Sequence, residues 1–342
     1  MEPTTAVNPG DILARLPAAF DAARKAGDLV FYDSTVRSVP GDFPFEIRTA
    51  PALGEKKAAT EEAESPEGPE TKRKRVDAPE RPSPLPPALR SRARVAQQVL
   101  PPSRALPPLP RRGGAAIPPP PTPGQLAQTF AFILAANRER RDLLAFYNGG
   151  PGAGASQRWR HLQFVEARAP IESWVRGMTF ERPNYPVIHP NLPYLHIVCP
   201  LPPAHNLPSP MSADDLVELA DRLAPLLMRS LDVAFDALRR AGGDRSQGWN
   251  LLMTLDHMHL IPRSAPSFVT EGLTLDINSL GYAGMLLVKS DAEGAALDRA
   301  AEKEGGLINI LTRCAIPREF GEQAAEAEAT LHLGSDEQLH GQ

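Results

Sequence analysis

Apolar residues recur at helical spacing in three stretches of this chain. Residues 9–26 carry them three or four positions apart, and residues 126–134 repeat the pattern after a proline. Ser212, followed three residues later by Asp215, has the sequence of a helix-capping box, and leucines then recur from 216 to 238 before a Gly-Gly pair. We therefore expect helices at the first two stretches and a long, half-buried helix at the third.

Short runs rich in β-branched and aromatic residues predict strands between these helices. The expected strands are 29–32, 143–147, 160–164, 194–199, 249–255, 257–261 and 285–288. Two further helices are expected at about 292–303 and 306–314. Short strands and helices without a regular alternation favour an α+β fold, with antiparallel strands and helices packed on one side.

The overall composition excludes several classes of protein. The 37 Lys and Arg residues against 41 Asp and Glu give a net charge of -4, so there is no general attraction to nucleic acid or an anionic membrane. Cys199 and Cys314 are too few for a disulfide framework or a Cys-based zinc site. The N-terminus has no signal-peptide pattern, and no run of about 18 apolar residues occurs. We expect a reducing, cytoplasmic location and neither a nucleic-acid nor a membrane partner.

A glycine-rich loop between two predicted strands carries the clearest chemical signal. It runs from Asn148 to Gln157, and its glycines let the backbone approach an anion closely. The side chains of Ser156 and Gln157 can donate hydrogen bonds to phosphate oxygens. No Gly-Lys-Ser/Thr follows, so this is not a Walker phosphate loop. The pattern predicts an anion site at this turn.

The strand after the loop adds a candidate nucleophile. Alternation along residues 160–164 sends Leu162 and Phe164 into the core and places His161 and Gln163 together on the opposite face. A histidine and an amide donor then face the mouth of the loop. A lone strand histidine is usually structural, and it is the neighbouring loop that favours a catalytic role for His161.

Together these residues resemble a family motif. The run from Phe146-Tyr147-Asn148 through the loop to Trp159-Arg160-His161-Leu162-Gln163 resembles that of the fungal ATP adenylyltransferases, or diadenosine tetraphosphate phosphorylases. They belong to the histidine-triad/galactose-1-phosphate uridylyltransferase superfamily, and their pattern is Phe-Tyr-Asn, a Gly/Ser-rich loop, Ser-Gln and His-x-His-Leu-Gln. The resemblance implies a histidine-triad-like antiparallel sheet with helices on one side, interrupted here by a long disordered Pro-rich segment.

The resemblance also implies a nucleotidyltransferase activity. His161 would attack an α-phosphorus and form an adenylyl-histidine intermediate that phosphate then opens, which divides one hard displacement into two easier ones. Diadenosine tetraphosphate and phosphate would give ADP and ATP, and the reverse reaction would transfer an adenylyl group from ATP. Donors for the phosphates would be Asn148, Gly154, Ala155, Ser156 and Gln157, with Gln163 at the transferred group.

A second patch resembles the same family. Asn278-Ser279-Leu280-Gly281-Tyr282-Ala283-Gly284-Met285, with Lys289 four residues on, is similar to a family segment whose leading tripeptide, Met and Lys line the nucleotide site. The runs 250–254 and 261–264 are family-like as well. Lys56 is aligned more loosely with a family lysine that reaches the phosphates. The implied substrate-binding residues are Lys56, Asn148, Gly154, Ala155, Ser156, Gln157, Gln163, Asn278, Ser279, Leu280, Met285 and Lys289.

Partners and cofactors follow from this chemistry. We expect a divalent cation, Mg²⁺, that is not tightly bound, and no dedicated metal site. The partners are small molecules, namely diadenosine tetraphosphate, ADP, ATP and phosphate, and the chain is expected to be a monomer. His257 and His259 share one face of a predicted strand, but without nearby Cys or carboxylates they are expected to be structural, as are His189, His196 and His205.

The resemblance divides the chain into four parts. We expect an N-terminal part of the catalytic domain at 1–61, a Pro-rich and charged segment of low order at 62–122, the adenylyltransferase core at 123–320 and a flexible tail at 321–342. The basic run Lys72–Arg75 is either a nuclear localisation signal, which would add the nucleus to the cytoplasm, or a solvated charge run. The Pro-rich stretch is typical of segments that dock into aromatic-lined grooves.

Two departures from the family leave alternatives open. Trp159 stands where the family has the first histidine of His-x-His-Leu-Gln, and a family strand pair with an Asn-Lys substrate contact has no counterpart. A catalytically impaired nucleotide-binding or interaction protein is therefore one alternative, and labelling of His161 by substrate would argue against it. A dinucleoside polyphosphate hydrolase is another, distinguished by whether water or phosphate accepts the adenylyl group.

A shifted reading frame would explain the missing strand pair. Read one base later, the codons for residues 96–108 permit Leu-Asn-Lys-Phe-Cys-Leu-Leu-Pro-Glu-His-Phe-Leu, the missing family pattern, and the Gln97-Gln98 pair is the tightest constraint. We hypothesise a shift from after about Pro66 to about Pro121. Sequencing the transcript across codons 60–125 is expected to restore that pattern; confirmation of the proline-rich text would instead favour the impaired protein.

Overall fold

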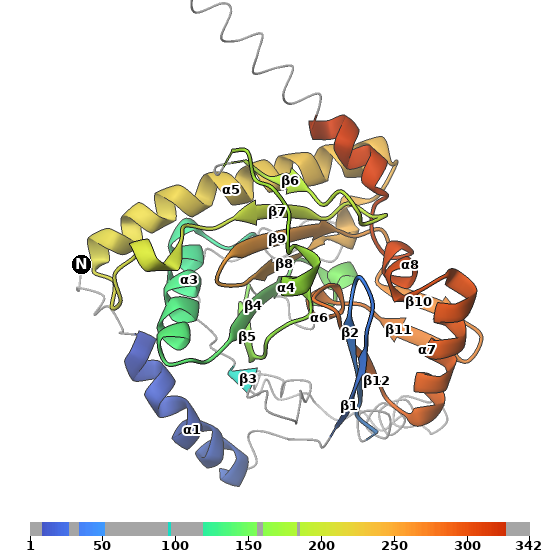
Figure 1. The fold of residues 1–342 in the computed structure, drawn as a ribbon, viewed down its shortest axis with the longest axis horizontal. Coiled ribbons are helices and arrows are strands. Elements are labelled where there is room, and N and C mark those ends of the chain that lie inside the picture. The colour runs from blue at the N-terminus through green and yellow to red at the C-terminus, as the bar shows by residue number, and fades with distance from the viewer. Residues whose placement is uncertain are drawn as a thin grey trace, which may run out of the picture.

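The computed structural model describes residues 9–26, 34–51, 95–96, 119–155, 160–182 and 185–325. Most of the segment expected to have low order, 62–122, lies outside these residues, as do the expected strand 29–32, Lys56, Ser156, Gln157 and Trp159. Within the described ranges, the fold is built on one large sheet and one smaller sheet, with helices between and around them (Figure 1).

The large sheet is antiparallel throughout. Its order is β3-β5-β4-β8-β9-β7-β6, and each strand pairs with its neighbours in antiparallel register. The strands are β3 (Val95–Ala96), β4 (Leu143–Asn148), β5 (Gln163–Glu166), β6 (Val187–Ile188), β7 (Ile197–Pro200), β8 (Trp249–Met253) and β9 (His257–Pro262). The central strands β4 and β8 are buried on both faces, which is why their sequences are apolar with little alternation.

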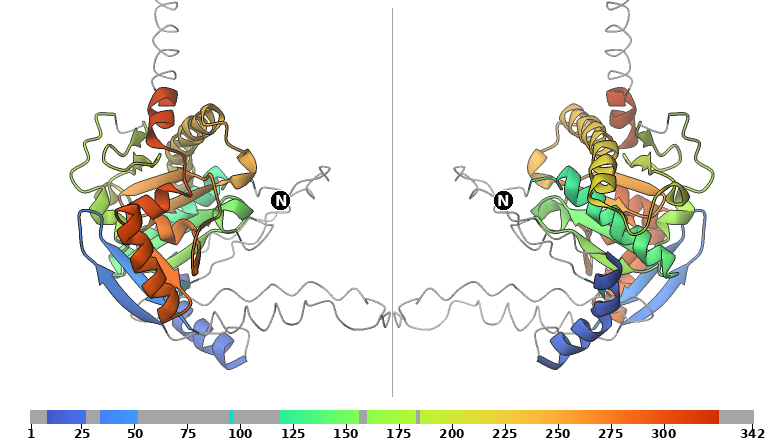
Figure 2. Two further views of the ribbon diagram at one scale, coloured as in Figure 1. Left: turned by 90° about the vertical axis from the view of Figure 1, so that its right-hand side faces the viewer. Right: turned by 90° about the vertical axis from the view of Figure 1, so that its left-hand side faces the viewer.

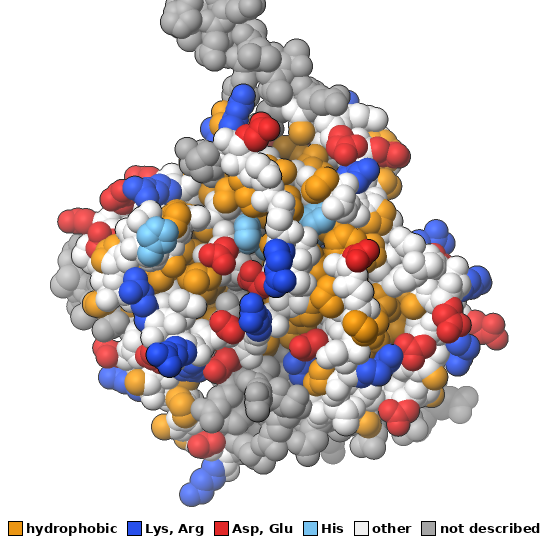
Figure 3. All heavy atoms as spheres, in the orientation of Figure 1, with side chains coloured by type: hydrophobic (Ala, Val, Ile, Leu, Met, Phe, Trp, Pro, Cys, Tyr) orange, Lys and Arg blue, Asp and Glu red, His pale blue; other side chains and the backbone are white. Residues whose placement is uncertain are grey.

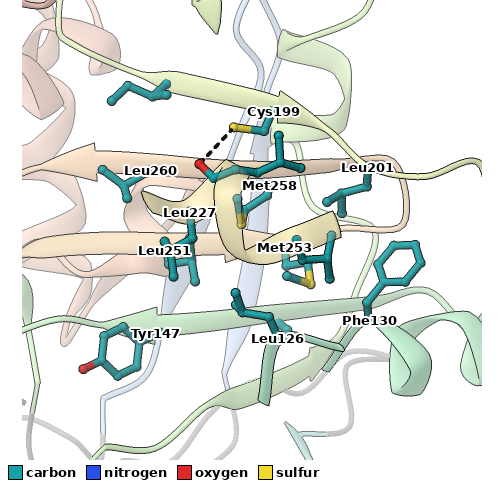
Figure 4. Packing of buried hydrophobic residues seen from close by; sticks show 14 of the residues in the cluster. Leu126, Phe130, Tyr147, Cys199, Leu201, Leu227, Leu251, Met253, Met258 and Leu260 are labelled. Atoms are coloured by element: carbon teal, nitrogen blue, oxygen red, sulfur yellow. Dashed lines mark hydrogen bonds between the residues drawn. The ribbon is translucent and has the colours of Figure 1, made fainter. Parts of the chain in front are cut away.

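Two helices, α3 (Pro123–Arg138) and α5 (Ala213–Arg240), cover one face of this sheet, and α1 (Pro9–Ala26) packs against α3. The right-hand view of Figure 2 shows them together on this side. The predicted capping box of Ser212 and Asp215 begins α5, and a second box, of Thr122 and Gln125, begins α3. Leucines of α5 meet alternate side chains of β8 and β9, as Figure 4 shows for Leu227, so a single apolar core fills the space between.

The other face of the large sheet packs against a second core. Here lie the short helices α4 (Ile171–Trp174) and α6 (Ser279–Tyr282), followed by α7 (Asp291–Glu304) and α8 (Leu307–Thr312). The smaller sheet has the order β1-β2-β12, from β1 (Thr35–Val39), β2 (Phe45–Thr49) and β12 (Met285–Val288), with β2 and β12 parallel. The hairpin of β10 (Ser267–Thr270) and β11 (Leu273–Asp276) precedes α6.

Three expectations need correction. The strand expected at 160–164 begins only at Gln163, because ladder pairing with β4 stops at Phe146 and the chain then diverges around the loop. Val95–Ala96 forms a two-residue strand inside the segment expected to lack one, pairing with the otherwise open side of β5. The flexible tail does not begin at 321, because residues 318–325 are helical and Ala324 is buried in the first core; residues 326–342 lie outside the described ranges.

Among the helices that the structure describes, none combines the length and apolarity needed to cross a bilayer. On the face shown in Figure 3, acidic and basic side chains are interspersed, without a broad area of one sign. Both cysteines, Cys199 and Cys314, are buried free thiols.

A buried histidine pair lies on the β7–β9 side of the large sheet. His196 Nε2 and His259 Nδ1 are 3.0 Å apart and share a hydrogen bond, and both rings are fully buried. Burial lowers the pKa of His196 to about 3 and that of His259 well below its ordinary value. Within the described residues, His196 Nδ1 and His259 Nε2 have no partner, and no group of side chains there is arranged to hold a metal. The rings are therefore neutral, structural groups.

We expect this pair to make the fold sensitive to acid. In the unfolded chain each histidine titrates near pH 6.5, so the unfolded state binds more protons than the native state below that pH. The stabilisation is complete above about pH 6.5 and is lost as pH falls toward the native pKa values; His196 alone loses about 2 kcal/mol by pH 5. Urea denaturation at pH 7 and pH 5 measures this. His196→Phe should reduce the loss, whereas an unchanged loss would contradict the role of the pair; His205→Gln, at an exposed site, is the control.

Candidate functional site

The site predicted around Asn148 is a network of buried amides. Asn148 ends β4 and lies opposite Asn250 on β8, on the sheet face that packs against the second core. Asn250 Nδ2 donates to Asn148 Oδ1 at 2.9 Å and to the Ala153 carbonyl at 2.9 Å. The Ser279 backbone N–H also donates to Asn148 Oδ1, at 3.0 Å, and the Ser279 hydroxyl lies 2.7 Å from the same oxygen. These contacts join the glycine-rich loop directly to the second predicted patch.

The orientation of these amides is set by Arg263, which follows β9 and is fully buried. Its Nη1 donates to Asn250 Oδ1 at 2.8 Å, and because a guanidinium can only donate, the Asn250 amide must turn its oxygen toward Arg263. Asn250 Nδ2 then points to Asn148 Oδ1. Since that oxygen is already held by donors, the Nδ2 group of Asn148 is the end of the amide that remains to donate to a ligand.

The loop itself is a compact turn. After β4 a short 3₁₀ helix, η1 (Pro151–Ala153), folds the chain back. The N–H groups of Gly154 and Ala155 donate to the carbonyls of Pro151 and Gly150, both at 3.0 Å. These two predicted phosphate donors are thus already bonded within the loop, and a phosphate would have to share or replace those bonds.

Gly154 is required by both conformation and space. Its φ of +86° lies in the left-handed region, and a Cβ there would lie 2.6 Å from the Cβ of Asn278. Asn278 caps α6, its Oδ1 accepting from the N–H of Leu280 at 2.9 Å. The loop therefore packs on the start of α6, which explains why a glycine-rich loop and an Asn-Ser-x-Gly segment far apart in sequence are needed together.

The predicted nucleophile lies beside this network. His161 and Gln163 are buried, with 4% and 9% of their surfaces exposed, while Leu162 and Phe164 belong to the first core, as the alternation predicts. Gln163 lies opposite Phe146 in the β4–β5 ladder. His161 lies two residues before Gln163 and Asn148 two residues after Phe146, just beyond this last pair of the ladder. The histidine and the start of the loop therefore both adjoin the same end of the β4–β5 ladder.

The chain just before α3 is tied to this end of the sheet. Tyr147 Oη donates to the Pro119 carbonyl at 3.0 Å, and Arg160 Nη1 donates to the Pro120 carbonyl at 2.6 Å. Burial raises the pKa of Tyr147 well above its usual range, so the phenol stays protonated as a donor. These two bonds tie the residues on either side of the loop to the same segment, Pro119–Pro120.

The remaining predicted residues spread along β12. Leu280 is partly buried on α6, and Met285, 4% exposed, begins β12 directly after it. Lys289 follows the other end of that strand, with its Nζ 3.8 Å from Asp276 Oδ2. The structure thus brings Asn148, Gly154, Asn278 and Ser279 into contact and leaves Lys289 outside that network; Lys56, Ser156 and Gln157 lie outside the described residues.

Asn250 and Arg263 were not among the predicted site residues. Both lie in runs that resemble the family, but neither run alone indicates that its polar side chain is buried. The signal available was an asparagine within an otherwise apolar strand, since a buried polar side chain needs a partner. Two surface cavities, of about 370 and 330 Å³, are lined by other residues, around β10 and around Arg141 and Glu172.

Two family models match this chain. The model of the Ap4A phosphorylase N-terminal domain matches residues 126–175, and that of the ATP adenylyltransferase C-terminal domain matches residues 190–317. Together the two matches span more than half of the chain. This chain belongs to the Ap4A phosphorylase family. The first match contains His161 and Asn148, and the second contains Asn250, Arg263 and Ser279.

Two curated relatives and two solved structures are similar to this chain. The chain is 25% identical over 214 residues to Protein APA1 of Saccharomyces cerevisiae and 27% identical over 218 residues to diadenosine 5',5'''-P1,P4-tetraphosphate phosphorylase 2 of the same yeast. Each alignment covers 60% of this chain, and 63% and 64% of the two relatives, which is less than two thirds of their length.

The structural likeness concerns the fold. Yeast Ap4A phosphorylase Apa2 in complex with AMP superposes with a TM-score of 0.61 at 19% identity, covering 91% of this chain and 97% of that one. The same enzyme in complex with Ap4A gives 0.56 at 18% identity, covering 89% and 97%. The α+β architecture is therefore that of this family.

Gly154→Ala is expected to disrupt the contact between the loop and α6. The added Cβ meets Asn278 at 2.6 Å, and the backbone has a left-handed φ. Gly177→Ala is a matched control, because Gly177 has a φ of +85° with nothing within 4 Å of its Cβ position, so it carries only the backbone penalty of about 1 kcal/mol. Urea denaturation should show a larger loss of unfolding free energy for Gly154→Ala. Equal losses would contradict the close packing of the loop on Asn278.

Proposed function

We propose that this chain is a nucleotidyltransferase that cleaves diadenosine tetraphosphate with phosphate to ADP and ATP, and also transfers an adenylyl group from ATP in reverse. The observation that carries the proposal is that the buried His161 and Asn148 both adjoin the end of the β4–β5 ladder where the loop packs on α6. The two yeast relatives, one named as a diadenosine tetraphosphate phosphorylase, support it.

The proposed reaction proceeds in two displacements. A ring nitrogen of His161 attacks the α-phosphorus of one adenosine, a nitrogen–phosphorus bond forms, and the bond to the bridging oxygen breaks to release ATP. Phosphate then attacks the same phosphorus, the nitrogen–phosphorus bond breaks, and ADP leaves. In this proposal Asn148 Nδ2 and the Gln163 amide donate to the oxygens of the transferred group.

In this proposal Mg²⁺ binds only together with the nucleotide. The buried groups around Asn148 are amides, a hydroxyl and backbone N–H groups, and Asn148 Oδ1 already accepts from several donors. This donor set does not fit a Mg²⁺ ion, which prefers carboxylates and water. We propose that the cation is held by the substrate phosphates, and no step of the reaction is assigned to it.

We propose small-molecule partners and a monomer, working in the cytoplasm. Diadenosine tetraphosphate, ADP, ATP and phosphate are the ligands that the chemistry requires. Size-exclusion chromatography with light scattering measures the oligomeric state, and a dimer would contradict the monomer.

Covalent labelling tests the role of His161. Incubation with diadenosine tetraphosphate labelled in the adenine should leave an acid-labile label on the wild-type chain, as expected for a phosphorus–nitrogen bond. His161→Ala should abolish the label and lower turnover by about a thousand-fold or more, because the nucleophile is lost. His205→Ala, at an exposed residue remote in the fold from the loop, should retain both.

Product analysis separates the alternatives. ADP together with ATP identifies phosphate as the acceptor, whereas AMP together with ATP in equal amounts would identify a hydrolase. Undiminished labelling or turnover in His161→Ala would show that another group is the nucleophile. Nucleotide binding without any label or product would favour the impaired binding protein.

A further inference from the structure

The small sheet has two unlike faces. In the β1–β2–β12 register, Ile47 lies beside Leu286 and both belong to the second core, while Arg37, opposite Ile47 on β1, reaches Asp298 of α7. This face is therefore the one covered by α7, which Figure 1 shows alongside the sheet. Side chains alternate between the faces of a strand, so Arg48 lies on the opposite face.

That opposite face also carries a predicted nucleotide-site residue. Arg48 is the register partner of Leu287, and Met285, two residues earlier on β12, lies on the same face of the sheet as Leu287. Lys289 follows two residues after Leu287. Arg48 is thus placed between the Met and the Lys that the family resemblance assigns to the nucleotide site, on the neighbouring strand.

Arg48 is buried without being satisfied. Its side chain is 4% exposed, and its one hydrogen bond runs from Nη2 to Glu46 Oε2 at 3.1 Å. Neither Nε nor Nη1 has a partner in the part of the chain that the structure describes. Burial lowers the pKa of Arg48 from its ordinary value, although Glu46 offsets part of this, so the guanidinium is held at a cost in solvation.

Arg263 shows what a purely structural arginine looks like in the same molecule. It is completely buried, and each of its three nitrogens donates: Nε to the Cys314 carbonyl, Nη1 to Asn250 and Ile277, and Nη2 to Ala265 and Pro266. Among the described residues, nothing comparable surrounds Arg48. A guanidinium with unused, buried N–H groups is a ready receptor for an oxyanion, because charged oxygens make the strongest bonds to it.

We propose that Arg48 binds a phosphate group in the substrate site. This proposal rests on the proposed function, since the phosphate comes either from the polyphosphate chain of the dinucleotide or from the phosphate that accepts the adenylyl group. The chemistry recognised is the same in both cases. Arg48 forms no covalent bond and moves no proton; it is a binding residue that neutralises and positions an oxyanion.

Equilibrium binding to the full-length chain tests the proposal without relying on catalysis. Inorganic tripolyphosphate, which mimics the chain, and inorganic phosphate, which mimics the acceptor, are titrated by calorimetry into wild type, Arg48→Gln, Arg48→Lys and Arg37→Gln. Arg48→Gln should weaken one of these ligands by roughly ten-fold or more, and Arg48→Lys should restore part of the affinity. Arg37→Gln is the matched control, because Arg37 lies on the adjacent strand and pairs with Asp298 on the other face.

Steady-state kinetics then distinguishes the two sources. A raised KM for diadenosine tetraphosphate with weakened tripolyphosphate binding identifies the polyphosphate chain. A raised KM for phosphate, with labelling of His161 unchanged, identifies the acceptor. If wild type binds an anion through Arg48 but shows no phosphorolysis, the proposed function fails while the assignment of Arg48 stands.

The proposal would be overturned by an Arg48→Gln chain that binds both anions as wild type does, even if its Tm falls, because that pattern describes a purely structural arginine. Failure of wild type to bind either anion would overturn it equally.

Discussion

The arrangement of the site depends on burying one cation, Arg263. Moving a guanidinium out of water costs several kcal/mol, and the fold offsets this by surrounding it with carbonyl and amide oxygens. Those oxygens come from β8, from the residue before Asn278 and from Cys314 after α8, so satisfying one side chain fixes the relative positions of three separate segments. The stacking of Arg263 over the Tyr282 ring, at 5.0 Å, adds α6 to the same group.

Hydrogen bonds connect Arg263 to the residues of the candidate site. Arg263 turns the Asn250 amide, Asn250 turns the Asn148 amide, and Ser279 holds the oxygen of Asn148 from the other side. The Nδ2 end of Asn148 remains to donate to a ligand. Between Arg263 and Asn148 Oδ1, each donor in the network meets an acceptor, as a low-dielectric setting requires.

Much of the architecture follows from local sequence rules. The strand 285–288 and the capping box at Ser212 coincide with the observed elements, because apolar runs and capping side chains act over a few residues. The ends of the elements depend instead on strand pairing and on packing in the core. β5 starts only at Gln163 because residues 160–162 do not pair with β4, which itself continues beside β8 to Asn148. Residues 318–325 are helical, and Ala324 packs in the first core.

The sequence by itself determined the chemical candidates: a glycine-rich loop, a histidine and an amide alternating after it, and an Asn-Ser segment much later in the chain. Tertiary structure alone decided which of these meet, bringing Asn148 and Ser279 into contact across 131 residues of sequence. It also separated two arginines of identical chemistry, Arg263 with every nitrogen bonded and Arg48 with two nitrogens unpartnered in the described chain. The physical reason is that burial and hydrogen-bond satisfaction depend on neighbours brought by the fold, which no local pattern specifies.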